Sequence, residues 1–394
     1  MTVPGLSTLL AEDGVRGRRV LVRADLNVPL ANGKVGDDTR IRASLPTLRK
    51  LLAGGARVVL LSHLGRPKGK HNPEFSLEPV AQHLARLLGH DVAFASDCVG
   101  EPARTVVDGL GEGQLALLEN VRFHPGETAG EAEFAQALAA LADDYVNDAF
   151  GTAHRAHAST AVVAGLAERA VAGDLLESEL EHLRVVLEPS RPLLCLLGGA
   201  KVSDKLSVLE ALAPHANVLA VGGAMAYTFL GARGEPVGKS LVEPDRFEDA
   251  RRVEQAAREA DCKLLLPVDH VVVEALEPDV PHHVADTVPD GSMGVDIGPE
   301  TARMYAQAAR EAATIFWNGP MGVFEIDAFA RGTEAVADAV AGSAATSVVG
   351  GGDSLAAVNK LGVGDRISHL STGGGAALEY VQGLELPGVA ALGR

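Results

Sequence analysis

Short apolar runs alternate with longer amphipathic stretches along nearly the whole chain. The short runs are bounded by glycine or proline, and we predict strands at Val20–Val22, Val58–Leu61, Leu115–Leu118, Leu193–Leu197, Val218–Val221, Lys263–Pro267, Thr314–Trp317 and Thr346–Val349. The stretches between them predict helices at Ala43–Ala53, Leu77–Leu88, Glu131–Leu141, Phe247–Glu259, Pro299–Glu311 and Gly332–Val340. This alternation is typical of βαβ units, so the expected fold class is α/β, with doubly wound parallel sheets.

The length of the chain predicts two domains. At 394 residues it exceeds the size at which a single hydrophobic core stops growing. The segment Asp174–Leu183 has helical apolar spacing, and Glu188–Pro192 then interrupts the chain before a new strand. We therefore predict an N-terminal domain at residues 1–173 and a C-terminal domain at residues 174–383, joined by a helix. A helical connector is semi-rigid, so it would serve as a hinge between the domains.

The composition excludes several classes of protein. An apolar content of 47% is ordinary for a globular chain, and no apolar run is long enough to span a membrane. The segment Met1–Arg19 lacks the apolar stretch of a secretory signal, so a cytoplasmic protein is expected. Three widely separated cysteines predict neither a disulfide framework nor a zinc site. The net charge of −17 argues against nucleic-acid binding, and without a heptad pattern a monomer is expected.

Polar and basic residues follow the predicted strands of the N-terminal half. Arg23, Asp25 and Asn27 alternate at the end of the first strand, and His63 and Arg66 follow the next. In a parallel sheet these positions are the carboxyl ends of strands, where ligands bind. Further arginines in similar settings are Arg40, Arg122 and Arg155. The planar guanidinium matches phosphate and carboxylate oxygens, so an anion site is predicted; the alternatives are separate surface ion pairs and an Arg23–Asp25 pair.

Glycine-rich turns follow the predicted strands of the C-terminal half. The segment Gly198–Lys205 is not a P-loop, yet its glycines permit a tight turn whose N–H groups face an anion. Lys201 and Lys205 are four positions apart, so a helix would place both on one face beside a phosphoryl group; the alternative is a solvated lysine face. Gly222 and Gly223 follow the next strand and would leave room for a flat base.

Two later segments join glycine to acidic residues. Gly350–Ser354 follows a predicted strand and opens a helix, where Asp353 can bind Mg²⁺ beside phosphate-facing N–H groups. The segment Trp317–Glu325 ends in Glu325, whose carboxylate can accept hydrogen bonds from ribose hydroxyls. Ser371–Gly375 offers a further helix N-terminus to an anion. Two phosphate-handling halves in one chain indicate a kinase.

The ordered set of motifs resembles the phosphoglycerate kinase family over nearly the whole chain. The matching segments are Arg23–Pro29, Ser62–Pro67, Glu119–Phe123, Asp148–His157, Gly198–Lys205, Trp317–Glu325, Gly350–Ser354 and Ser371–Gly375. The resemblance implies two α/β domains facing a cleft, the first binding 3-phosphoglycerate or 1,3-bisphosphoglycerate and the second binding ADP or ATP with Mg²⁺. It also implies that residues 384–394 pack back on the N-terminal domain.

The resemblance assigns individual residues to each ligand. For the phosphoglycerate these are Asp25, Asn27, Arg40, His63, Leu64, Gly65, Arg66, Arg122 and Arg155. For the nucleotide they are Lys201, Lys205, Gly222, Gly223, Gly294, Glu325, Gly351, Gly352, Asp353 and Ser354, with Asp353 near Mg²⁺. The expected catalytic positions are Arg40, Lys201 and Gly374. Two positions depart from the family pattern, because Ala224 stands where glycine is frequent and Ala377 where serine is frequent.

Two further hypotheses compete with a glycolytic kinase that transfers a phosphoryl group between 1,3-bisphosphoglycerate and ADP. An NAD-dependent dehydrogenase would carry a GxGxxG fingerprint after a strand, with an acidic residue about 20 positions further on, and we find no convincing example. A non-catalytic binding module on the same fold would tolerate the loss of a charged site residue. Arg40, Lys201 and Asp353 are all present, which favours the kinase.

Overall fold

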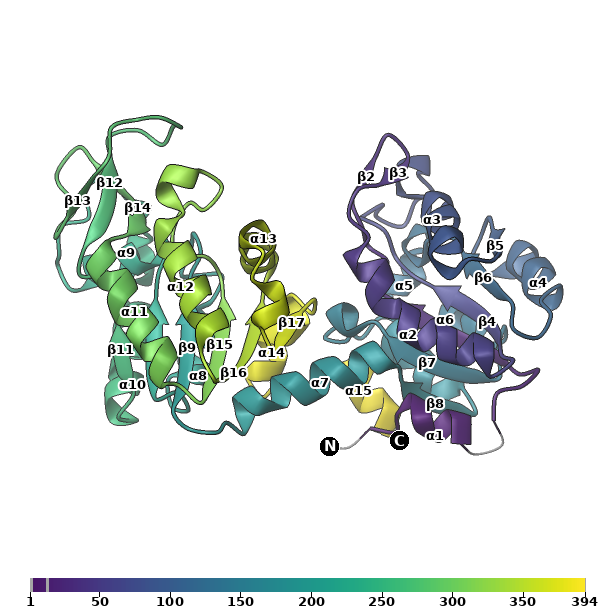
Figure 1. Cartoon of the computed structure of the whole chain (residues 1–394). Coiled ribbons are helices and arrows are strands. Elements are labelled where there is room, and N and C mark those ends of the chain that lie inside the picture. Colours follow the sequence, from purple (N-terminus) through teal and green to yellow (C-terminus); the bar gives the residue numbers. More distant parts are fainter. Residues whose placement is uncertain (1–2, 12–13, 394) are drawn as a thin grey trace. The chain divides into compact units, whose positions relative to one another are not determined.

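The computed structural model describes residues 3–11 and 14–393 and divides into two compact units. Unit 1 extends to Leu180 and includes the C-terminal segment from Glu385, whereas unit 2 comprises Glu181–Leu384. The helix α7 (Asp174–Leu187) is continuous and contributes residues to both units (Figure 1). Throughout the described residues, every helix is too short or too polar to traverse a lipid bilayer.

Unit 1 is built on a six-stranded sheet of order β5–β6–β4–β1–β7–β8 in which all neighbouring strands are parallel. The strands are β1 (Arg19–Ala24), β4 (Arg57–Leu61), β5 (Val92–Ala95), β6 (Leu115–Leu118), β7 (Asp144–Asp148) and β8 (Arg169–Ala172). The strands β4, β5 and β6 lie on one side of β1, whereas β7 and β8 lie on the other. The order in which strands are added to the sheet therefore changes side between the neighbouring strands β1 and β7. Such a switch point is where open parallel sheets bind ligands.

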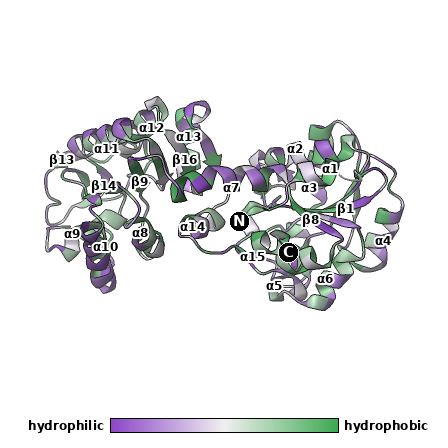
Figure 2. Cartoon of the chain, turned by 90° about the horizontal axis from the view of Figure 1, so that it is seen from below, coloured by the Kyte–Doolittle hydropathy of each residue, from purple (hydrophilic) through white to green (hydrophobic). Residues whose placement is uncertain are grey.

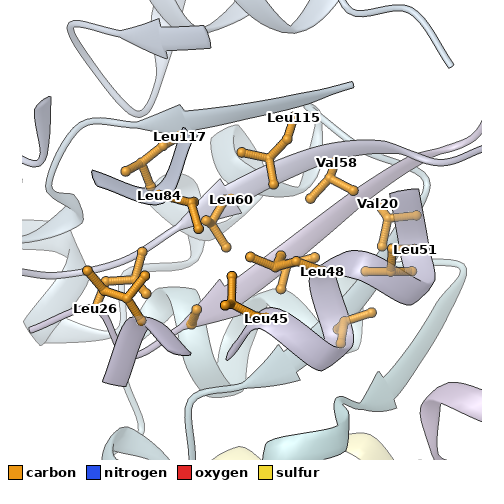
Figure 3. Close-up of a cluster of buried hydrophobic side chains, with 14 of the residues drawn as sticks. Val20, Leu26, Leu45, Leu48, Leu51, Val58, Leu60, Leu84, Leu115 and Leu117 are labelled. Atoms are coloured by element: carbon orange, nitrogen blue, oxygen red, sulfur yellow. The ribbon is translucent and has the colours of Figure 1, made fainter. Parts of the chain in front are cut away.

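Helices cover this sheet and bury a leucine-rich core. They are α1 (Leu6–Ala11), α2 (Thr39–Ala53), α3 (Glu78–Leu88), α4 (Gly100–Asp108), α5 (Pro125–Ala129), α6 (Ala132–Ala139) and α15 (Pro387–Ala390); β2 (Leu30–Ala31) and β3 (Lys34–Val35) form a hairpin. Leu45, Leu48 and Leu51 recur at helical spacing on α2 and pack towards Val20 and Leu60 of the sheet (Figure 3). Burying each leucine contributes about 1.5–3 kcal/mol, so this face fixes α2 on the sheet.

Unit 2 has a second six-stranded parallel sheet, of order β11–β10–β9–β15–β16–β17. Its strands are β9 (Leu193–Leu197), β10 (Val218–Val221), β11 (Lys263–Leu265), β15 (Thr314–Asn318), β16 (Thr346–Gly350) and β17 (His369–Ser371). Its helices are α8 (Leu206–Leu212), α9 (Met225–Ala232), α10 (Phe247–Glu259), α11 (Pro299–Glu311), α12 (Arg331–Gly342), α13 (Gly352–Leu361) and α14 (Gly375–Val381). The predicted α/β class with parallel sheets is therefore confirmed.

Helix α10 shows how a hydrophilic segment still packs. Figure 2 displays it as a predominantly hydrophilic helix. Only a narrow stripe faces the interior, where Ala250, Val253 and Ala257 are buried at intervals of three and four residues. The spacing, rather than the overall hydropathy, predicts this helix correctly.

Every strand and helix predicted from the apolar pattern is present, with small shifts of the ends, but several strands were not predicted. An antiparallel sheet of β12 (His270–Val273), β13 (His283–Ala285) and β14 (Met293–Ile297) lies within unit 2. The missed strand β7 is wholly buried although it contains two aspartates and an asparagine. Asp144 is satisfied there by Arg18 and Arg169, with oxygen–nitrogen distances of 2.7 and 2.8 Å. These partners come from distant parts of the chain, so local polarity misled the prediction.

The C-terminal segment packs within unit 1. The N–H of Gly388 donates to the carbonyl of Ala153 at 2.8 Å, and the side chain of Asn147 donates to the carbonyl of Gly388 at 3.0 Å. A Cβ atom at Gly388 would lie 3.1 Å from the backbone of Ala153. A glycine at this position thus permits the close approach of α15.

Candidate functional site

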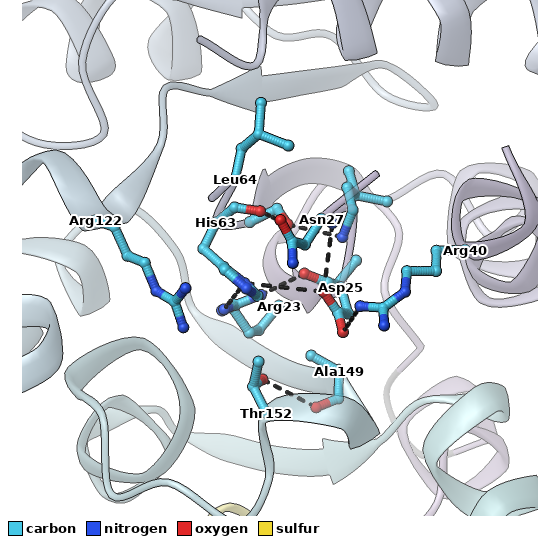
Figure 4. A network of polar contacts seen from close by, with 12 residues as sticks. Arg23, Asp25, Asn27, Arg40, His63, Leu64, Arg122, Ala149 and Thr152 are labelled. Carbon is cyan, nitrogen blue, oxygen red and sulfur yellow. Dashed lines mark hydrogen bonds and ion pairs between the residues drawn. The ribbon is translucent and has the colours of Figure 1, made fainter. Parts of the chain in front are cut away.

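The predicted anion-binding residues of unit 1 gather at the switch point of its sheet. Asp25 and Asn27 follow β1, His63 follows β4, and Arg40 projects from the first turn of α2 (Figure 4). Arg40 donates to Oδ2 of Asp25 at 2.6 Å, and Nδ1 of His63 lies 3.9 Å from Oδ1 of Asp25. The side chain of Asp25 thus brings together the segments that follow β1 and β4 and the first turn of α2.

Arg23 does not form the ion pair with Asp25 that the sequence left open, although the structure describes both residues. Instead Nε of Arg23 donates to Oγ of Ser159 at 2.9 Å, and its Nη2 lies 3.1 Å from Nδ1 of His63. Arg23 is fully buried. Its guanidinium group therefore contacts the ring of His63 from the buried side of the site.

The loop after β4 is held by a set of side-chain hydrogen bonds. Oδ1 of Asn27 accepts the N–H of Gly65 at 2.9 Å, and Arg122 donates to the carbonyl of Gly65 at 2.8 Å. Gly65 has a φ of 61°, and a Cβ atom there would lie 2.4 Å from the ring of Phe75. Asn120 also donates to the carbonyl of Leu64 at 2.7 Å. Leu64 and Gly65 are thereby fixed beside the charged residues.

The electrostatics of this site favour a bound anion. Burial lowers the pKa of His63 well below its ordinary value, and the neighbouring arginines add to the effect, so the ring is neutral at pH 7. Burial, Arg155 and Arg23 together lower the pKa of Arg122 to about 10. Nε of Arg122 has no hydrogen-bond partner among the described residues, and Arg66 is exposed. Clustered guanidinium groups that repel one another are stabilised by phosphate or carboxylate.

Unit 2 contains a pocket of about 220 Å³ lined by glycine-rich turns and by β14. Four of the residues predicted for the nucleotide line it: Gly223, Gly294, Glu325 and Asp353. Tyr227 and Asp296, which sequence reasoning missed, also line it. A Cβ atom at Gly294 would lie only 1.7 Å from the hydroxyl oxygen of Tyr227. The absence of a side chain at this position makes room for the Tyr227 hydroxyl against β14.

Asp296 could not be found from the sequence because the antiparallel sheet that carries it was not predicted. Asp296 is buried. Its carboxylate accepts hydrogen bonds from the backbone N–H of Gly332 at 2.6 Å and from that of the adjacent Ile297 at 2.9 Å. Burial nevertheless raises the pKa of Asp296 to about 7. The residue therefore fixes the start of α12 beside the pocket.

Other predicted nucleotide residues have structural contacts and do not line the pocket. Gly222 lies against Met321, because a Cβ atom there would be 2.4 Å from the sulfur. Oγ of Ser354 accepts the N–H of Gly319 at 2.5 Å. Gly351, with a φ of 92°, precedes α13, which begins at Gly352. Gly374, a predicted catalytic position, has a φ of 55° and likewise precedes a helix, α14. Both glycines supply turns that other residues rarely adopt.

The predicted helical lysine face is wrong. Helix α8 begins at Leu206, so Lys201 and Lys205 both lie in the preceding turn. Nζ of Lys205 donates to the carbonyl of Asn318 at 2.7 Å and also contacts the Asn318 side chain. Burial lowers the pKa of Lys205 to about 8. Lys201 is exposed. The two lysines therefore lie in different environments, Lys201 exposed and Lys205 partly buried.

The residues of unit 2 fit a magnesium ion that a nucleotide carries. Asp353 is exposed, lines the pocket and lies in the first turn of α13. In the described part of the chain, the one group of three potential metal ligands is Asp97, Cys98 and His124, in unit 1. Mg²⁺ is commonly held by one or two carboxylates plus substrate phosphates, so a single aspartate suits it.

The fold and the two sites are typical of an α/β phosphotransferase. The family model described as phosphoglycerate kinase matches residues 10–384, and the chain belongs to this family. A phosphoglycerate kinase of Salinispora tropica is 56% identical over 402 residues, covering 100% of both chains. One of Rubrobacter xylanophilus is 57% identical over 383 residues, covering 96% of both.

Solved structures agree with this assignment. The structure of phosphoglycerate kinase from Coxiella burnetii matches with a TM-score of 0.90 and 44% identity, covering 99% of each chain. That from Pyrococcus horikoshii matches with a TM-score of 0.84 and 34% identity, covering 99% of this chain and 98% of the other. The likeness extends over both units.

Proposed function

We propose that this chain catalyses reversible, Mg²⁺-dependent phosphoryl transfer between 1,3-bisphosphoglycerate and ADP, giving 3-phosphoglycerate and ATP in cytoplasmic glycolysis. The observation that carries the proposal is the cluster of arginines around the neutral His63 in a chain of this family. A carboxyl group of the substrate is the phosphoryl acceptor in the reverse direction. Neither a dehydrogenase nor a non-catalytic binding module has comparable support.

The phosphoglycerate is proposed to bind in unit 1. Arg122, Arg155 and Arg66 are suited to its phosphate, because guanidinium groups form bidentate hydrogen bonds to phosphate oxygens. Asp25 and Asn27 are suited to its hydroxyl group, and the neutral His63 can donate a further hydrogen bond. Leu64 and Gly65 shape the wall beside them.

The chemistry requires positioning and charge stabilisation rather than a general base. The acceptor carboxylate is already ionised at pH 7, so no proton has to be removed. Arg40 is pre-oriented by Asp25 while its side chain stays 36% exposed, which leaves it available to the migrating phosphoryl group. Lys201 and the N–H groups around Gly374 are proposed to share this role.

The nucleotide is proposed to bind in the pocket of unit 2, with Glu325 on the ribose and Asp353 near Mg²⁺. When bound, the metal would neutralise phosphate charge. Lys205 would act mainly by holding the turn at Asn318, since its ammonium group is already bonded there. No nucleic acid, membrane or second chain is needed for this activity, and we propose a monomer.

Transfer in line requires both substrates to meet, so the two domains, proposed at residues 1–173 and 174–383, must approach each other in the reacting complex. We assign the hinge to α7 and to the turn at Asn318–Pro320. Small-angle scattering with 3-phosphoglycerate and a nucleotide analogue should show compaction relative to the free protein. An unchanged radius of gyration would exclude domain closure.

The decisive test is 3-phosphoglycerate-dependent conversion of ATP to ADP with Mg²⁺, comparing wild type with Lys201→Ala. Loss of one transition-state charge is expected to reduce kcat by about 10²–10³-fold. Lys239→Ala is a matched control, because Lys239 is also an exposed lysine of unit 2 and bonds the carbonyl of Ser292 through its backbone N–H, which alanine keeps. No turnover in the folded wild type would contradict the proposed function, whereas equal turnover in Lys201→Ala would remove only its assigned role.

A further inference from the structure

Unit 2 contains a second cavity, of about 590 Å³, beside α11 and α12. Its floor is apolar and made of small side chains: Ile297, Ala302, Ala306 and Ala335. Ala302 and Ala306 lie four positions apart on α11, and both are buried. A cavity of this volume falls within the range of small-molecule sites, which is about 300–1,000 Å³.

The charged residues around this second cavity are all cationic or imidazole-bearing. Arg303 and Arg310 come from α11, Arg331 begins α12, and His282 and His283 lie at β13. No aspartate or glutamate is among the described residues that line it. The whole chain has 52 acidic and 35 basic residues. The lining of this cavity is therefore positively charged, whereas the protein as a whole is negatively charged.

The three arginines differ in how far they are already neutralised. Arg303 forms a two-pronged ion pair with Glu300, at 3.0 and 2.6 Å. Arg310 bonds the neutral amide of Gln307, at 3.1 Å. Arg331 is exposed, and its side chain has no hydrogen bond or ion pair to any residue that the structure describes. Two guanidinium groups thus remain without a carboxylate partner beside an apolar floor.

We propose that this second cavity binds an amphiphilic anion of small-molecule size. The hydrophobic body of the ligand lies on the alanine floor, and its carboxylate, sulfonate or phosphate head group bonds Arg331 and Arg310. Burial of apolar surface on the floor favours binding of the hydrophobic body, and the guanidinium groups select the charge of the head group. Neither contribution involves a residue assigned above to phosphoryl transfer.

The second cavity shares a wall with the pocket proposed for the nucleotide, so a test must distinguish the two. Ile297 lines both cavities, and Gly332, which lines the second, donates to Asp296 of the first at 2.6 Å. Displacement of a ligand by Mg-ADP would therefore not reveal which cavity it had left. Substitutions that affect only the second cavity are needed instead.

The probe is anilinonaphthalene sulfonate, a fluorescent molecule with an apolar ring system and one sulfonate, titrated into the full chain. Wild type should bind a single dye molecule with enhanced emission. The double variant Arg310→Gln/Arg331→Gln should weaken binding by roughly tenfold or more, because it removes both guanidinium groups that lack a carboxylate partner. Arg258→Gln, at an exposed arginine of α10, is the matched control and should change the affinity less than about twofold.

A second variant tests the apolar floor without altering charge. Ala335→Phe fills the second cavity from a partly exposed position of α12, and it should abolish dye binding while circular dichroism shows an unchanged fold. Dye binding that is equal in wild type, Ala335→Phe and the double variant would overturn the proposal. So would an unchanged affinity for decyl sulfate, measured by calorimetry on the same proteins.

Discussion

Asp148, the last residue of β7, accepts the backbone N–H of Leu175 at 2.9 Å through its Oδ1 atom. The bond joins the central sheet of unit 1 to the first turn of α7. Nearby, the N–H of Asp174 donates to Oγ1 of Thr47 at 2.9 Å, and the Asp174 carboxylate pairs with Lys50 at 2.8 Å. The start of the helix that we assign to the hinge is therefore bonded on several sides.

The buried carboxyl of Asp148 should make the stability of unit 1 depend on pH. Burial raises its pKa from 3.8 to about 7, against the opposing bonds from Thr47 and α7. The folded state then keeps a proton that the unfolded state releases between about pH 4 and 7. The contribution of Asp148 to the free energy of unfolding should fall as pH rises through this window, by about 1.4 kcal/mol per pH unit, and level off above it.

Asp148→Asn tests this prediction, because the amide cannot titrate. The stability of the variant relative to wild type should increase steadily up to about pH 7 and then stay constant. Urea unfolding should be followed by circular dichroism, since the single tryptophan, Trp317, lies in unit 2. Asp296, whose pKa is also raised to about 7, is present in both proteins and cancels in the difference. A difference independent of pH would show that Asp148 is ionised in the folded state throughout.

Arg122→Gln should weaken the binding of 3-phosphoglycerate selectively. A hydrogen bond to a charged group contributes about 1.5–3 kcal/mol, so KM for 3-phosphoglycerate should rise by roughly 10- to 100-fold while KM for ATP stays unchanged. Arg104→Gln is the control, because Arg104 is an exposed arginine of α4 in the same unit. Steady-state kinetics with each substrate varied in turn gives both constants. A parallel rise in both would indicate a general disturbance of the fold.

Ser354→Ala should destabilise unit 2 more than it affects nucleotide binding. Oγ of the fully buried Ser354 accepts the N–H of Gly319, and its loss leaves a buried donor without a partner, at a cost of about 1–3 kcal/mol. Trp317 precedes this turn, so its fluorescence reports the unfolding directly. The exposed Ser207, substituted by alanine, should leave the midpoint nearly unchanged. If KM for ATP rose while stability held, Ser354 would act on the ligand instead.

The local pattern predicts much of the fold because buried strands and amphipathic helices have distinct periods. It also indicates why Asp25 and His63 lie near each other, since the carboxyl ends of parallel strands share one edge of a sheet. The contacts of Arg23 were beyond such reasoning. Its partner Ser159 lies 136 positions away in the chain and is brought near only by tertiary packing.

Unit 2 shows the same limit more clearly. Of the two glycines that follow β10, Gly223 lines the pocket, whereas Gly222 packs against Met321. Lys201 and Lys205 are misjudged because the turn continues to Leu206, which no residue between them signals. Asp296 lies on a short antiparallel sheet whose strands have only three to five residues, too few for a clear alternation. Tyr227 lies on α9, and its place in the pocket beside Gly294 follows from tertiary packing.

Gly294→Ala should block the pocket that we propose for the nucleotide. The new Cβ would lie 1.7 Å from the hydroxyl oxygen of Tyr227, and Tyr227 is buried and hydrogen-bonded to His270 at 3.3 Å, so the ring cannot easily move. KM for ATP should rise by at least about tenfold, which corresponds to about 1.4 kcal/mol, while KM for 3-phosphoglycerate should not change. Gly342→Ala is the control, because nothing lies within 4 Å of a Cβ at that position.

The double variant Gly294→Ala/Tyr227→Phe distinguishes this steric mechanism from a direct role of the Tyr227 hydroxyl. Phenylalanine removes the atom nearest to the new Cβ, although the ring carbon that bore it would still lie only 2.2 Å away, so rescue should be partial. Tyr227→Phe alone should have little effect on KM for ATP if the hydroxyl only contacts His270. A double variant no better than Gly294→Ala, together with a strongly impaired Tyr227→Phe, would mean that the hydroxyl itself binds the nucleotide.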